Sequence, residues 1–195
     1  RYFETAAKER VRYPFGFGLS YTDFRIWDVS FSAGEKDAEI TFTVQNIGTV
    51  PGKEVVQVYV TAPEGALSKP EKVLAGFAKT RELKPGLKEQ MRIAVPYESF
   101  ASYDETGASG FASSYILEKG EYLFHIGRNV RETEVAGSFT LEETVCLASL
   151  SQALAPVTPF ERMRFIREKD GAVHKVMEAA PLRKKNPAEK RKELL

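Results

Sequence analysis

The chain has 195 residues, of which 43% are apolar and 28% charged, an ordinary composition for a globular domain. Its 28 basic and 27 acidic side chains almost cancel, so no overall field would draw it to nucleic acid or to an anionic membrane. No apolar run approaches the roughly 20 residues that span a bilayer. The single cysteine, Cys146, excludes an internal disulfide framework and is expected to be a small, half-buried hydrophobe.

An aromatic segment occupies the first 20 residues. Between Tyr13 and Thr22, ten residues hold four aromatic rings, two glycines and a proline. Rings at that density need neighbours to cover them, so we expect residues 1–20 to be a connector that anchors one domain on another. The Gly16-Phe17-Gly18 spacing lacks the third glycine and the strand–turn–helix context of a phosphate-binding loop, so close backbone packing explains it better.

Residues 21–145 alternate between apolar and polar positions in a way that is typical of strands, with turn signals between the runs. The strand-like runs are residues 24–31, 38–44, 55–60, 73–77, 90–95, 122–127 and 137–141. Seven short strands over about 120 residues predict an all-β fold, an antiparallel β-sandwich whose two sheets cover each other's apolar faces.

The first three runs indicate which side chains face the core. The inward positions are expected to be Phe24, Ile26, Val29, Phe31, Ala38, Ile40, Phe42, Val44, Val56, Val58 and Val60. The opposite face of residues 55–60 carries Val55, Gln57 and Tyr59, which is less polar than a fully solvated face should be. We therefore expect a neighbouring segment to cover that face.

Two segments depart from the strand pattern. Residues 101–114 are rich in Ser, Gly and Ala and predict a long loop or a strand interrupted by an insertion. From Leu150 onward prolines and charges accumulate, so residues 146–195 are predicted to form a partly helical linker. One amphipathic helix is expected over residues 160–167, and another should begin at Asn186-Pro187. The basic residues from Arg183 to Lys192 indicate a solvated helix face rather than a contact for nucleic acid or acidic lipid.

Several motifs follow one another in order along residues 1–127. They are Arg1-Tyr2-Phe3-Glu4-Thr5, the segment from Tyr13 to Phe24, Val44-Gln45-Asn46-Ile47-Gly48, Gly52 to Val60, Pro70 to Phe77, Leu83-Lys84-Pro85-Gly86 and Glu118 to Tyr122. Together they resemble the fibronectin-III-like domain of glycoside hydrolase family 3, the β-glucosidase and β-xylosidase group, and the connector that leads into that domain. The resemblance implies an immunoglobulin- or fibronectin-III-like sandwich that follows an α/β sandwich domain.

The resemblance also implies where the chemistry lies. Members of this group are retaining glycosidases, with an Asp nucleophile on a barrel domain and usually a Glu acid/base on the α/β sandwich domain. Neither domain corresponds to residues 1–195, so no catalytic residue is carried over, no cofactor is expected, and the chain alone should be inactive. Some bacterial members have a reversed order with the barrel last, and residues 146–195 resemble the linker of that arrangement. The expected partners are therefore the other domains of the same polypeptide; the compartment stays open, with the bacterial cytoplasm favoured.

The residues themselves offer no competing active site. Neighbours in a strand point to opposite faces, so Asp104-Glu105 and Glu142-Glu143 cannot clamp one glycosidic bond and are expected to be solvated surface charges. His125, expected to be outward-facing or hydrogen-bonded, and His174 are far apart in the sequence, and no metal site is predicted from them.

Three functional hypotheses follow. The first is a structural accessory domain that braces catalytic domains through the connector. The second is a carbohydrate-binding module, because sugars stack on exposed rings. The candidate rings are Trp27, Tyr59, Tyr97, Tyr103, Phe111 and Tyr115. A patch facing another domain would favour the first hypothesis, whereas a solvent-facing row of rings would favour the second. A free-standing protein-interaction sandwich is a third reading, disfavoured by the connector.

Overall fold

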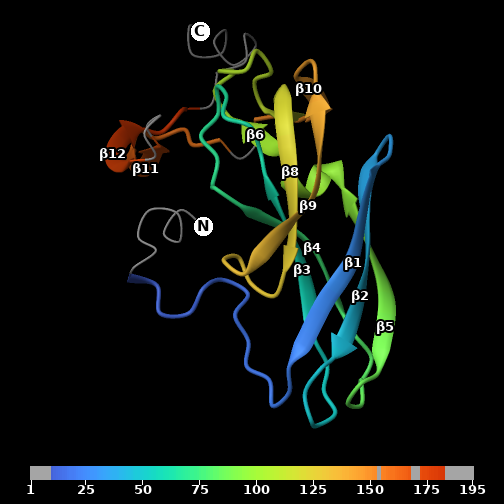
Figure 1. Ribbon diagram of the computed structural model, residues 1–195. Coiled ribbons are helices and arrows are strands. Elements are labelled where there is room, and N and C mark those ends of the chain that lie inside the picture. Colours follow the sequence, from blue (N-terminus) through green and yellow to red (C-terminus); the bar gives the residue numbers. More distant parts are fainter. Residues whose placement is uncertain (1–9, 153–154, 168–171, 183–195) are drawn as a thin grey trace, which may run out of the picture.

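Two antiparallel sheets face each other in the computed structural model, which describes residues 10–152, 155–167 and 172–182 (Figure 1). One sheet consists, in spatial order, of β1 (Phe24–Ala33), β2 (Asp37–Asn46) and β5 (Lys88–Pro96). The other consists of β4 (Val73–Lys79), β3 (Val55–Thr61), β8 (Gly120–Gly127) and β9 (Thr133–Leu141). These are the seven strands that the alternation predicts, so the all-β sandwich is confirmed. The short helix η2 (Tyr97–Phe100) follows β5.

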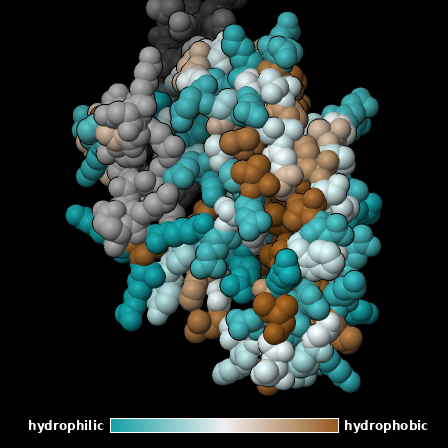
Figure 2. Space-filling model, viewed as in Figure 1, coloured by the Kyte–Doolittle hydropathy of each residue, from teal (hydrophilic) through white to brown (hydrophobic). Residues whose placement is uncertain are grey.

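The core lies between the two sheets, where the sequence pattern placed it. The predicted inward residues of β2 (Ala38, Ile40, Phe42 and Val44) are fully buried. They face the equally buried Val56, Val58 and Val60 of β3. An aromatic cluster completes the core, formed by Phe31, Phe100, Tyr122, Phe124 and Phe139. In Figure 2 the face in view is largely polar, with apolar side chains gathered in a broken band among the polar ones.

A β-bulge in β1 explains why its inward positions change phase. The pairing of β1 with β2 shifts register between Trp27 and Ser30, and Asp28 adopts a positive φ of 56°. An extra residue in one strand moves the following side chains to the other parity. Phe24 and Ile26 therefore face inward before the bulge, and Val29 and Phe31 pack against the core after it. Gly137 on β9 gives the Phe31 ring its space, because a Cβ there would lie 2.4 Å from the ring.

A third, smaller sheet lies at one end of the sandwich and contains the segment predicted as an insertion (Figure 1). It is built from β10 (Val145–Ser149), β7 (Ser114–Leu117) and β6 (Ser102–Asp104), in that order. Residues 105–113 form the loop between β6 and β7. Cys146 on β10 is exposed, so the expectation of a half-buried cysteine is wrong; β10 is an edge strand, bonded on one side only.

The helix expected over residues 160–167 is a strand. β11 (Glu161–Arg167) pairs antiparallel with β12 (Val173–Ala179), and the two form a separate ribbon beside the sandwich (Figure 1). Arg162, Met163 and Arg164 alternate between charged and apolar, which is the period of a strand, and Glu178 of β12 binds both arginines from across the ribbon. The ion-pair partner Glu178, 14 to 16 residues away in the sequence, thus favours the strand over a helix. The second predicted helix, from Asn186, lies outside the described residues.

Candidate functional site

The outer face of β3 is covered by the aromatic connector, as its sequence indicates. The side-chain amide of Gln57 donates hydrogen bonds to the Gly16 carbonyl at 2.9 Å and to the Arg128 carbonyl at 2.6 Å. The Tyr59 hydroxyl donates to the Gln57 amide oxygen at 2.5 Å and lies 3.3 Å from the Phe15 carbonyl. The expectation that a neighbouring segment covers this face is therefore confirmed. Gln57 binds the connector directly, and Tyr59 orients the Gln57 amide.

The connector approaches the sheet so closely that only glycine fits at its centre. Gly16 has a φ of +81°, and a Cβ there would lie 2.0 Å from the Gln57 side-chain oxygen. The neighbouring Phe15 carbonyl accepts a further hydrogen bond from the Val130 backbone N–H at 3.0 Å. The sequence-based interpretation of this glycine as a close-packing residue agrees with this geometry.

The described part of the connector binds through the carbonyls of Phe15 and Gly16, and its large apolar side chains remain exposed. Leu19 and Tyr21 are 90% and 99% exposed, and Tyr13, Phe15 and Phe17 are also exposed. Tyr13 and Phe17 lie together, with ring centroids 5.1 Å apart. We call Tyr13, Phe15, Phe17, Leu19 and Tyr21 the connector patch. Large apolar side chains left exposed along one segment in this way mark a surface that packs against another molecule or domain.

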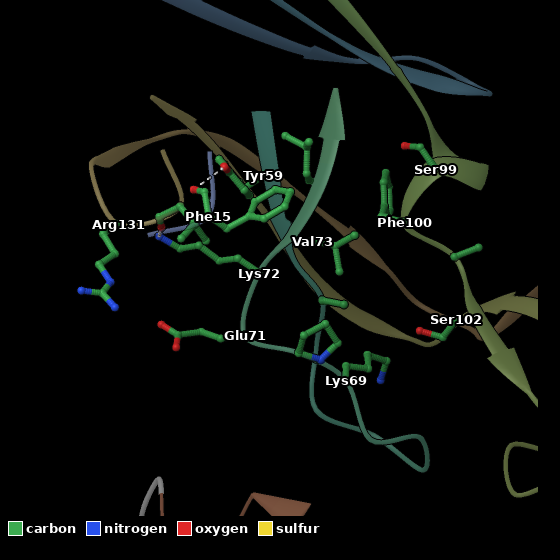
Figure 3. Close-up of a pocket in the computed structure, with 15 residues that line it drawn as sticks. Phe15, Tyr59, Lys69, Glu71, Lys72, Val73, Ser99, Phe100, Ser102 and Arg131 are labelled. Carbon is green, nitrogen blue, oxygen red and sulfur yellow. Dashed lines mark hydrogen bonds between the residues drawn. The ribbon is translucent and has the colours of Figure 1, made fainter. Parts of the chain in front are cut away.

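A cavity of about 590 Å³ lies beside the connector (Figure 3). Phe15, Tyr59, Val73 and Phe100 supply apolar walls, and Lys72 reaches across it to the Val130 carbonyl at 3.2 Å and the Thr133 hydroxyl at 2.7 Å. At its lower end in Figure 3, Lys69 forms a buried ion pair with Glu118. Glu118 also accepts a bond from the Ala66 N–H at 2.7 Å and so fixes the loop before Pro70. Because 49 residues separate Lys69 from Glu118, no local pattern could have shown this pair.

His125 of β8 lies opposite Tyr59, on the outer face of the same sheet. It is hydrogen-bonded, as expected. Its Nε2 lies 3.0 Å from the Thr61 hydroxyl. Burial, and then the nearby Lys72 ammonium, lower the pKa of His125, whereas Glu71 opposes the change. The imidazole is therefore neutral at pH 7. Within residues 10–152, 155–167 and 172–182, no group of His, Cys, Asp and Glu side chains is arranged to hold a metal ion.

The neighbouring carboxylates predicted to be surface charges divide into two kinds. Glu142 and Glu143 are exposed, as expected. Asp104 is fully buried, so that expectation is wrong for this residue. Its two oxygens accept hydrogen bonds from the backbone N–H groups of residues 106–109 and from the Ser109 hydroxyl. Asp104 therefore organises the insertion loop and does not take part in a pair of catalytic carboxylates.

The six candidate sugar-binding rings are not gathered into one row. Tyr59 is buried under the connector, and Tyr97 stacks on Phe139 with centroids 5.1 Å apart. Trp27 lies under the Lys88 ammonium at 5.6 Å on the other sheet. The structure brings Tyr103 of β6 and Tyr115 of β7 together, directly opposite each other, with centroids 5.3 Å apart and exposed fractions of 41% and 43%. Phe111, in the loop between them in sequence, is also exposed.

Gln57 supplies a prediction about how the connector is held. Gln57→Ala removes both side-chain bonds to Gly16 and Arg128, so we expect the free energy of unfolding to fall by about 1–2 kcal/mol. Cleavage of the connector by a protease should become faster at the same time. Gln90→Ala, at an exposed position of β5, is the matched control and should change neither quantity. Equal cleavage rates for the two variants would show that Gln57 does not hold the connector.

Comparison with known proteins shows which class of domain the sandwich is and which protein family the chain belongs to. Residues 54–130 match the family model of the fibronectin type III-like domain. A β-glucosidase of Ruminococcus albus is 45% identical over 194 residues, which are 98% of this chain and 20% of that protein. β-Glucosidase A of Butyrivibrio fibrisolvens is 43% identical over 84% of this chain and 22% of its own length.

Solved structures agree. The structure of a β-glucosidase from Paenibacillus barengoltzii superposes with a TM-score of 0.84 at 38% identity, over 98% of this chain and 22% of that one. β-Glucosidase 3B of Thermotoga neapolitana superposes with a TM-score of 0.66 at 34% identity, over 75% of this chain and 19% of that one. The antiparallel sandwich is thus a fibronectin type III-like domain. It is the fibronectin type III-like domain of glycoside hydrolase family 3, and the chain spans about a fifth of the relatives' length.

The described residues contain no helix that is both long enough and apolar enough to cross a membrane.

Proposed function

We propose that the chain is a structural accessory domain of a retaining, β-glucosidase-like enzyme of family 3, and that it braces the catalytic domains of the same polypeptide. The observation that carries this proposal is the connector. Its backbone is bound to the sandwich by the Gln57 side chain and the Val130 N–H, while the large apolar side chains of the connector patch stay exposed. A segment held in this way is fixed to one domain and offers its side chains to another.

The proposal includes a division of the chain and its partners. Residues 1–20 are the connector from an α/β sandwich domain, residues 21–145 are the fibronectin type III-like sandwich, and residues 146–195 lead to a catalytic barrel. The relatives matched over 98% of this chain carry the final segment as well as the sandwich, so this segment recurs together with the sandwich in them. The nucleophile and the acid/base then lie in the other domains, and this segment contributes stability and position.

The experiment is an assay of the whole polypeptide that contains this chain. We expect it to hydrolyse an aryl β-D-glucoside with retention at the anomeric carbon, and we expect residues 1–195 alone to show no hydrolysis. A whole polypeptide that hydrolyses no β-glycoside would contradict the proposal. Activity of residues 1–195 alone would contradict it too, because the accessory role places both catalytic carboxylates elsewhere.

The Tyr103–Tyr115 pair favours a second candidate function, carbohydrate binding. Two exposed tyrosines side by side offer ring faces for stacking and hydroxyls for hydrogen bonds, on two paired strands whose connecting loop Asp104 holds in place. Titration of the chain with cellohexaose and xylohexaose tests this role. Saturable binding that Tyr103→Ala and Tyr115→Ala abolish, and that Trp27→Ala leaves intact, would support it. Absence of binding at millimolar concentration would remove this candidate and leave the accessory role.

A further inference from the structure

The ribbon of β11 and β12 has no strand partner outside itself among the described residues. Its register runs from Glu161 opposite Ala179 to Arg167 opposite Val173, and neither strand joins a sheet of the sandwich. In Figure 1 it stands to one side of the strands that form the core. A two-stranded ribbon alone is at best marginally stable in water. Its two faces must therefore find other surfaces.

One face of the ribbon is bound to the sandwich by charge. Arg162 Nη1 donates to Glu105 of the insertion loop at 2.6 Å, and its Nε donates to Glu178 at 3.0 Å. Arg164 donates to the other oxygen of Glu178 at 3.2 Å. Burial alone would raise the pKa of Glu178, but the bonds from Arg162 and Arg164 outweigh it and lower that pKa. Arg162, Arg164 and Glu178 are all partly buried.

The other face of the ribbon is apolar at its centre and exposed. Met163 and Met177 lie directly opposite each other, and their exposed fractions are 53% and 56%. The exposed charges Glu161 and Lys175 lie on the same face of the ribbon, on either side of the two methionines. Methionine is unbranched and adapts its shape to a partner, so an exposed methionine pair suits a packing surface. We call Met163 and Met177 the methionine face.

We infer that the methionine face packs against an apolar surface of another domain of the same polypeptide, most directly the domain that follows the ribbon. The inference rests on the proposed function. The relatives are about five times as long as this chain, so most of their surface lies outside it, and the relatives matched over 98% of the chain include the ribbon. Arg162 binds the charged face to Glu105, whereas the face of Met163 and Met177, apolar at its centre, makes no such bond among the described residues. The ribbon then acts as an arm that joins the sandwich to the next domain.

Cysteine labelling in the whole polypeptide tests this inference. Met163→Cys and Met177→Cys are made separately in a background carrying Cys146→Ser, because Cys146 itself is exposed. The rate of reaction with a maleimide is measured in buffer and divided by the rate in denaturant. Glu35→Cys, in the turn between β1 and β2, is the matched exposed control. We expect the normalised rates at positions 163 and 177 to be at least tenfold lower than at position 35.

The outcomes separate this inference from the proposed function. If the whole polypeptide hydrolyses an aryl β-glucoside but positions 163 and 177 react as fast as position 35, the accessory role stands and the arm is overturned. Slow labelling that also occurs in residues 1–195 alone, together with a dimer by light scattering, would assign the methionine face to a second copy and overturn the inference. Absence of hydrolysis by a folded whole polypeptide contradicts the proposed function whatever the labelling rates.

Discussion

Phe124→Ala is expected to lower the free energy of unfolding by about 3–5 kcal/mol, the largest effect of any substitution considered for this domain. Phe124 is fully buried at the centre of the aromatic cluster. Its ring lies 5.0 Å from that of Phe31, 5.6 Å edge-on from that of Phe100 and 5.8 Å from that of Phe139. Removal of the ring leaves a cavity between the sheets that surrounding strands cannot close. Urea unfolding followed by Trp27 fluorescence measures the loss.

Phe77→Ala is the matched control, because Phe77 is the same residue type on β4, the edge strand of the same sheet, and is largely exposed. Its effect should stay within about 0.5 kcal/mol. Phe124→Leu keeps most of the volume and should cost about 1–2 kcal/mol. A loss below about 1 kcal/mol for Phe124→Ala would mean that the aromatic cluster is not the centre of the core.

Asp104→Ala is expected to cost about 2–4 kcal/mol, because several N–H groups of the insertion loop lose a charged acceptor together. Oδ1 accepts from the Gly107 N–H at 2.7 Å, and Oδ2 accepts from the Ser109 N–H at 2.8 Å and from the Ser109 hydroxyl at 2.5 Å. Thermal unfolding measures the effect, and Glu142→Ala, the removal of an exposed carboxylate, is the control. Faster proteolysis of residues 105–113 should accompany the loss. A melting temperature equal to that of the control would contradict this role.

The pH dependence of stability gives an independent check on Asp104. Burial alone would raise its pKa, but the hydrogen bonds from Ser109, Gly107 and Ala108 outweigh burial and lower the pKa below its usual value. A carboxyl group with a lower pKa in the folded state stabilises the fold fully above about pH 4, and this stabilisation is lost as the pH falls through the folded-state pKa. The difference in stability between the native chain and Asp104→Asn should therefore shrink as the pH falls below about 4. A difference that stays constant down to pH 2 would contradict the assignment.

Much of the sandwich could be predicted because its information is local. The alternation of Ala38, Ile40, Phe42 and Val44 fixes one buried face, and it is buried as expected. The outer face of β3, which carries Gln57 and Tyr59, is less polar than a solvated face, and this predicts that a neighbouring segment covers it. The connector is that segment. The apolar–polar alternation and the composition of about ten residues are enough to predict which face of a strand is buried.

The parts that could not be predicted depend on contacts between distant segments or on the course of a loop. Asp104 is buried because the loop that follows it folds back and presents backbone N–H groups to its carboxylate. The adjacent acidic residues Asp104 and Glu105 do not indicate this fold. The local signal is Gly107 and Ser109, three and five residues later. The local sequence of residues 160–167 predicts a helix, but the structure is a strand, because Glu178, which binds Arg162 and Arg164, comes from the next strand. Lys69 and Glu118 meet only in the folded chain.

If another domain covers the connector patch, polar substitutions there should affect the whole polypeptide and not the isolated chain. Leu19→Ser and Tyr21→Ser are introduced together, because both side chains are almost wholly exposed in this chain. We expect the melting temperature of residues 1–195 to stay unchanged, while the half-life of β-glucosidase activity of the whole polypeptide at elevated temperature falls at least tenfold. Leu87→Ser, at an exposed turn, should change neither value. An unchanged half-life for the Leu19→Ser, Tyr21→Ser variant would contradict the bracing role.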